Sequence, residues 1–124
     1  MRVGKKHLIV VGDRVLIEPE DPSDRTAVGL YLPQTVVEKE KVAGGRIVAV
    51  GPGSPVPDFD RDDDEFWRSE AHKPRYVPMQ AQAGDYALFL KKASVDIQFE
   101  GREYVIVPHA AVLALVREQD TPAT

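Results

Sequence analysis

The sequence predicts an all-β protein, a small β-barrel, in one domain that spans residues 1–124. Short runs of β-branched and aliphatic residues recur along the chain, and glycine-containing turns separate them. This pattern favours a small barrel. The length suits one hydrophobic core, and a chain with 43% hydrophobic and 29% charged residues has an ordinary globular composition.

Two apolar runs near the N-terminus predict the first strands. Leu8–Val11 and Val15–Ile17 flank Gly12–Arg14, and the second run stops at Pro19. We expect a strand, a kink and a second strand. Arg46–Val50 predicts a further buried strand, with glycines on both sides.

The C-terminal third predicts a strand and then a hairpin. Asp85–Leu90 is strand-like, and Val95–Phe99 alternates apolar and polar residues. Glu100 and Gly101 then form a turn, after which Glu103–Val107 returns, which is typical of a β-hairpin. The local pattern leaves the last segment, Val112–Val116, open between a helix and a short buried strand.

Residues 52–83 differ from the rest of the chain. They contain five prolines and an acidic cluster, and no helical or strand period persists in them. Because the segment is longer than ordinary connections, we interpret it as an excursion from the core that is functional, flexible or both.

A second polar stretch, residues 18–29, reads as a long surface loop, yet large apolar residues follow it directly at Leu30, Tyr31 and Leu32. These side chains could anchor the loop in the core, or they could form a recognition motif. Burying each one would contribute roughly 1.5–3 kcal/mol, whereas ordering each backbone residue costs about 1–2 kcal/mol. A single such loop would therefore bind weakly, but many loops on one ring would bind strongly.

No catalytic constellation or cofactor motif is visible, so we expect no enzyme activity, no cofactor and no metal. The chain has no cysteine and its three histidines are far apart. An acidic run from Asp58 resembles a calcium loop, but Asp63 replaces the required glycine and Ser69 the required glutamate. The net charge of −4 argues against nucleic acid. No apolar run is long enough for a membrane span or a signal peptide, so a cytoplasmic location is expected.

Four segments in the same order resemble the small co-chaperonins of the GroES type. They are "GDRVLIEP" (12–19), "VGLYLPQTVVEKEKVAGGRIVAVGPG" (28–53), "AGDYALFLKK" (83–92) and "EGREYVIVPHAAVLALVRE" (100–118). The resemblance covers roughly residues 8–117 apart from the proline-rich excursion. It implies a GroES-like barrel in a ring of seven, in which the N-terminal strand of one subunit pairs with the C-terminal strand of the next. We therefore expect a strand from about Val112.

The resemblance also implies a partner and a binding site. The ring would cap a GroEL-type chaperonin in the presence of nucleotide and close its folding chamber. A mobile loop, about residues 20–36, would bind the chaperonin's apical domains through Gly29, Leu30, Tyr31 and Leu32. We expect this loop to be poorly ordered without its partner.

Three features depart from the family pattern. Val28 stands where a glycine is usual, which would stiffen the loop or alter its turn. Tyr31 is larger and more polar than the usual aliphatic residue. The excursion at about residues 52–83 replaces the shorter roof hairpin and would bring negative charge near the central opening.

A second hypothesis keeps the fold but not the chaperonin. In it the chain is an oligomeric binding or scaffold protein that uses its acidic excursion, with a cation bound through Asp58, Asp60, Asp62 and Asp64. A third hypothesis, a zinc-dependent dehydrogenase domain, lacks its cysteine ligands and its dinucleotide-binding domain.

Overall fold

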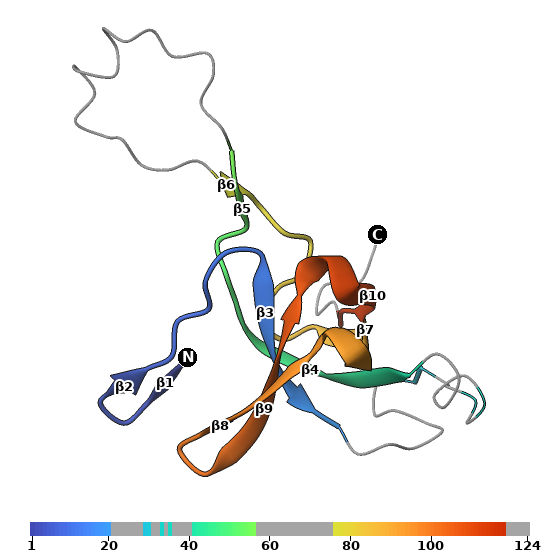
Figure 1. Cartoon of the computed structure of the whole chain (residues 1–124), viewed down its shortest axis with the longest axis horizontal. Coiled ribbons are helices and arrows are strands. Elements are labelled where there is room, and N and C mark those ends of the chain that lie inside the picture. Colours follow the sequence, from blue (N-terminus) through green and yellow to red (C-terminus); the bar gives the residue numbers. More distant parts are fainter. Residues whose placement is uncertain (21–28, 31–32, 34, 36–40, 57–75, 119–124) are drawn as a thin grey trace, which may run out of the picture.

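A six-stranded antiparallel sheet dominates the fold (Figure 1). The computed structural model describes residues 1–20, 29, 30, 33, 35, 41–56 and 76–118. The strand order is β10-β7-β4-β3-β9-β8. The strands are β3 (Arg14–Pro19), β4 (Val42–Val50), β7 (Tyr86–Leu90), β8 (Val95–Phe99), β9 (Arg102–Pro108) and β10 (Val112–Val116). The all-β prediction is confirmed.

Smaller elements complete the described part of the chain. Strands β1 (Arg2–Val3) and β2 (Lys6–His7) form an N-terminal hairpin, and β5 (Ser54–Pro55) pairs with β6 (Tyr76–Val77). Two single 3-10 turns, η1 (Lys91–Ala93) and η2 (His109–Ala111), lead into β8 and β10. No helix among the described residues has the length and apolarity that crossing a membrane would require.

Strand β3 is buried on both faces, which explains its unbroken apolar run. Val15 and Ile17 lie in one core cluster, whereas Leu16 points to the other face of the sheet. The first cluster joins β3 to β4, β7 and β9; its buried members are Val15, Ile17, Ile47, Ala81, Ala87, Phe89, Val105, Val107 and Ala111. The second cluster surrounds Leu16 and Tyr104, and N-terminal residues cover it.

Register shifts help to curl the sheet around the first cluster. Leu16 pairs with Ala49 but Ile17 pairs with Ile47, so Val48 is an extra residue in β4. A second shift lies between Val112 and Ala114 in β10. Such bulges bend a strand and increase its twist.

The predicted hairpin is confirmed as β8 and β9. Phe99 pairs with Arg102, and the two turn residues between them, Glu100 and Gly101, have φ values of 51° and 79°. Two positive φ values match the twist of the flanking strands. The strand predicted from about Val112 is also confirmed, since β10 pairs antiparallel with β7.

Three expectations about strands are wrong. Residues 8–11 form no strand within this chain; the N-terminal strand pair lies before them. Strand β4 begins at Val42, so Gly44 and Gly45 lie inside it instead of bounding it. The excursion contains regular structure at its base, because β5 and β6 pair there.

Candidate functional site

The connection between β3 and β4, residues 20–41, is fixed to the sheet at both ends. At its start, Pro19 pairs with Gly45, and the Glu20 N–H donates to the Gly44 carbonyl at 2.9 Å. At its end, the Lys91 N–H donates to the Lys41 carbonyl at 2.8 Å, and Val42 pairs with Leu90. The predicted recognition loop therefore leaves from and returns to a rigid base.

A glycine allows the close approach of strands at this base. A Cβ on Gly45 would collide with the Glu18 carbonyl oxygen and would lie 2.9 Å from the Cα of Pro19. A side chain there would push β3 away from β4, so the missing Cβ keeps the start of the loop against the sheet.

The four predicted binding residues are only partly described. Gly29 is exposed with a φ of 86°, and apart from its own chain neighbours no heavy atom of the described residues lies within 4 Å of the position a Cβ would take. Leu30 is half-buried. Tyr31 and Leu32 lie outside the described residues, as does most of the segment 20–36 that we expect to be poorly ordered. The role of Leu30, Tyr31 and Leu32 in binding therefore stays a prediction from the sequence.

The excursion and the loop leave from opposite ends of β4, as Figure 1 shows. At the excursion end, the Gly51 N–H donates to the Arg14 carbonyl at 2.9 Å, and the Gly53 N–H donates to the Gly12 carbonyl at 3.0 Å. Nine strand residues correspond to about 30 Å along the backbone. The points at which the two segments join β4 are therefore separated by the length of that strand.

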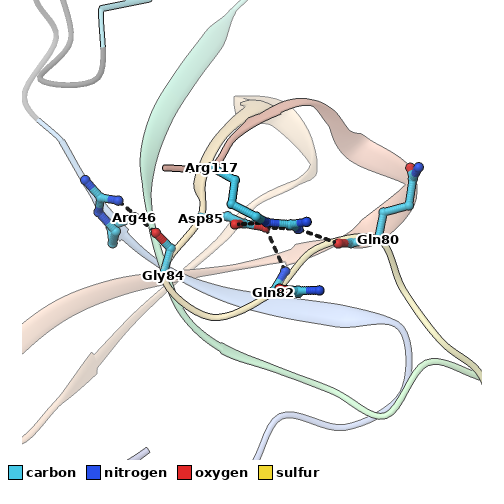
Figure 2. Close-up of polar contacts among 6 residues, drawn as sticks. All are labelled: Arg46, Gln80, Gln82, Gly84, Asp85 and Arg117. Carbon is cyan, nitrogen blue, oxygen red and sulfur yellow. Dashed lines mark hydrogen bonds and ion pairs between the residues drawn. The ribbon is translucent and has the colours of Figure 1, made fainter. Parts of the chain in front are cut away.

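An ion pair between the buried Asp85 and the partly exposed Arg117, which the sequence patterns did not reveal, lies where β10 ends and β7 begins (Figure 2). Arg117 donates through Nε to Oδ1 of Asp85 and through Nη2 to Oδ2, both at 2.7 Å. Its Nη2 also donates to the Gln80 carbonyl at 2.9 Å. The Gln82 N–H donates to the same Asp85 carboxylate at 2.9 Å. This network ties the turn before β7 to the end of β10.

The pKa of the Asp85 carboxyl is lowered from its ordinary value of 3.8. The hydrogen bond from Arg117 is the main cause, and the Gln82 N–H and the charge of Arg46 act in the same direction. Burial opposes them, since Asp85 is only 2% exposed. Each oxygen of the Asp85 carboxylate accepts at least one hydrogen bond. This arrangement is typical of a residue that stabilises the end of a strand, and it does not suit a reactive carboxylate.

Two segments carry apolar groups at open backbone edges. Strand β10 ends the sheet, and Leu113 on it is 53% exposed. A groove of about 490 Å³ runs along this strand; its lining includes Val112, Leu113, Ala114 and Leu115. In residues 8–11, Ile9 and Val11 are 69% and 71% exposed.

The described residues contain no group of three His, Asp or Glu side chains placed to hold a metal ion. The acidic residues Asp58, Asp60, Asp62 and Asp64, which the second hypothesis uses, lie outside the part of the chain that the structure describes.

Known proteins resemble this chain over most of its length. The GroES co-chaperonin of Coprothermobacter proteolyticus is 32% identical over 110 residues, which cover 89% of this chain and 95% of that protein. The chain belongs to the GroES co-chaperonin family. The GroES proteins of Rhodothermus marinus and Geobacillus kaustophilus are each 32% identical, over 88% and 86% of this chain and 91% and 97% of their own lengths. The family model described as "Chaperonin 10 Kd subunit" matches residues 7–64.

The family confirms the resemblance found in the sequence and favours the co-chaperonin interpretation over the scaffold hypothesis. The GroES relatives carry the name of a co-chaperonin and not the name of an enzyme. The match from residue 7 to residue 64 includes the loop and the start of the excursion, but it leaves out the N-terminal strand β1.

Proposed function

We propose that seven copies of the chain form a ring that caps a GroEL-type chaperonin in the presence of nucleotide and closes its folding chamber. Family membership over 89% of the chain carries this proposal. Each whole chain, residues 1–124, acts as one domain of the ring, in the cytoplasm. The ring hydrolyses no nucleotide; it supplies binding surface and a cover.

The connection between β3 and β4 is the chaperonin-binding loop in this proposal, with Gly29, Leu30, Tyr31 and Leu32 as the contact residues. Its fixed base supports this role, because both ends are held in the sheet by Gly44, Gly45 and Leu90. When a loop becomes ordered on binding, the entropy cost of ordering its backbone offsets much of the free energy gained by burying its apolar side chains. Seven weak contacts on one ring would still hold firmly, and they would release together when the chaperonin changes shape.

The ring would form through the open edges already described. Residues 8–11 of one subunit would pair with β10 of the next, which covers Ile9, Val11 and Leu113 together. The excursion would then lie at the end of the ring away from the chaperonin, since it leaves β4 opposite the loop.

The test is a double variant, Leu30→Ser with Leu32→Ser, incubated with a GroEL-type chaperonin and nucleotide. We expect the native mass of the ring to stay unchanged while co-purification with the chaperonin is lost. The matched control replaces two exposed valines at the base of the excursion, Val56→Ser with Val77→Ser, and keeps binding. If the loop variant co-purifies as well as the parent chain, the proposed binding residues are wrong.

A further inference from the structure

The first six residues of the N-terminal hairpin lie before the region matched by the family model, which begins at residue 7. Arg2 pairs with His7 and Val3 with Lys6. Met1 and Leu8 extend this pairing by one step. The Leu8 N–H donates to the Met1 carbonyl at 2.8 Å, and the Met1 amino group donates to the Leu8 carbonyl at 3.0 Å. The hairpin therefore ends at Leu8, where the open segment begins.

The hairpin contacts the rest of the subunit through a solvent-exposed salt bridge and through apolar packing. Nζ of Lys6 lies 2.8 Å from Oε1 of Glu100, in the turn between β8 and β9. Met1 and Leu8 pack against the second core cluster around Leu16 and Tyr104. These contacts hold Leu8 at a defined place on the outer face of the sheet.

The far end of the open segment is fixed as well. The Gly53 N–H donates to the Gly12 carbonyl at 3.0 Å, and the His109 N–H donates to the Asp13 carbonyl at 2.8 Å. Residues 9–11 thus lie between two anchors, one at Leu8 and one at Gly12 and Asp13.

Between these anchors the segment behaves as a strand without a partner. Val10 points inward and is 8% exposed, whereas Ile9 and Val11 point outward. Across the described ranges, no residue forms a hydrogen bond with the backbone of Ile9, Val10 or Val11. Buried and exposed side chains alternate in this segment as they do in a half-buried strand. The free backbone N–H and C=O groups of the segment could form a β-ladder with another chain.

We propose that the N-terminal hairpin is an intramolecular clamp that holds residues 9–11 extended and ready to pair with β10 of a second copy of this chain. The inference rests on the proposed ring. A second copy fits because it brings an open backbone edge and an exposed Leu113 to the exposed Ile9 and Val11. Since the clamp orders the segment during folding, assembly loses less conformational freedom and the ring becomes tighter.

The first experiment removes residues 2–7, so that Met1 precedes Leu8 directly, and compares the variant with the complete chain. Native mass spectrometry and sedimentation over a dilution series give the concentration at which half of the rings dissociate. We expect this concentration to rise about tenfold. Amide hydrogen exchange at residues 9–11 of the assembled protein should become faster, while β3 and β9 keep their protection.

A point variant avoids the risk that the deletion harms folding. Lys6→Glu sets two like charges against each other at Glu100 and should loosen the clamp. Lys5→Glu is the matched control, because it makes the same charge change on an exposed neighbour that has no partner in the described structure. The reversed pair, Lys6→Glu with Glu100→Lys, should restore the dissociation concentration of the parent.

The results of these experiments distinguish a failure of the clamp proposal from a failure of the ring proposal. If the parent forms rings and the deletion and Lys6→Glu variants dissociate at the same concentration as the parent, the clamp is wrong and the ring stands. An equal weakening by Lys5→Glu and Lys6→Glu also contradicts the clamp, because a charge effect alone would explain it. A parent chain that stays monomeric at every concentration would overturn both proposals.

Discussion

The guanidinium group of Arg117 binds both carboxylate oxygens of Asp85, at 2.7 Å from Nε to Oδ1 and 2.7 Å from Nη2 to Oδ2. The two residues continue the pairing of β10 with β7, in which Val116 lies opposite Tyr86. The ion pair therefore fixes the end of the strand that the ring would use as its edge. A planar guanidinium suits this position because it can meet two oxygens at once.

Asp85→Asn should destabilise the subunit. An amide can no longer accept two hydrogen bonds from Arg117 and a third from the Gln82 N–H, so we expect the free energy of unfolding to fall by roughly 1–2 kcal/mol. Denaturant unfolding at a fixed protein concentration measures this change. Asp96→Asn is the control, since the exposed carboxylate of Asp96 on β8 has no partner among the described residues, and the substitution should change the free energy of unfolding by less than about 0.5 kcal/mol. Equal effects of both variants would contradict the role of the ion pair.

The same carboxylate predicts a pH dependence. Because the pKa of Asp85 is lower in the folded chain than its ordinary value of 3.8, the ionised form stabilises the fold. This stabilisation is complete above the unfolded pKa and is lost as the pH falls through the folded pKa. The difference in melting temperature between the parent and Asp85→Asn should stay constant from about pH 7 to 5 and shrink below about pH 4. A difference that persists unchanged at about pH 2.5 would be inconsistent with this account.

Gly45→Ala should disturb the base of the predicted chaperonin-binding loop. The added methyl group would meet the Glu18 carbonyl oxygen and the Cα of Pro19, and backbone atoms can move only by separating β3 from β4. We expect a loss of roughly 1–3 kcal/mol in the free energy of unfolding, together with faster amide exchange at Glu20, whose N–H bonds to Gly44. A variant as stable as the parent would show that the strands tolerate a wider separation.

Leu113→Asp should weaken the ring without unfolding the subunit. Leu113 is 53% exposed on the open edge of β10, so a carboxylate there is tolerated in the monomer but becomes buried when a neighbour covers it. The concentration at which half of the rings dissociate should rise about a hundredfold, which corresponds to roughly 3 kcal/mol. Val77→Asp, at a residue that is 56% exposed on β6, is the control and should leave dissociation unchanged. Rings of normal strength in Leu113→Asp would place the interface elsewhere.

Local patterns predicted the strands that find partners close by in the chain. The alternation of Val95–Phe99 and the turn at Glu100 and Gly101 are local, and the hairpin formed as expected. The segment Val112–Val116 was undecided on propensity alone, because its alanines and leucines suit a helix. Its pairing with β7 makes it a strand, and only the resemblance to a family indicated that outcome in advance.

Two of the errors, at residues 8–11 and at the base of the excursion, share one cause. Residues 8–11 have a strand's composition, but they have no ladder partner among the described residues of their own chain. Ser54–Pro55 lacks a strand pattern, yet it pairs with Tyr76–Val77 across the excursion. Propensity describes how a residue suits a pleated surface; whether a strand forms depends on a partner that can be distant in the sequence or on another chain.

The sequence by itself determined the all-β class, the succession of most of the main strands along the chain, the family and the apolar triplet, because each of these depends on the identity and order of neighbouring residues. Only the tertiary structure decided that Asp85 meets Arg117 and that an N-terminal hairpin ends at Leu8, directly before residues 9–11. The first of these contacts joins residues that lie 32 positions apart in the chain. Such contacts form when folding brings the strands together and buries the groups between them, and no local pattern records that step.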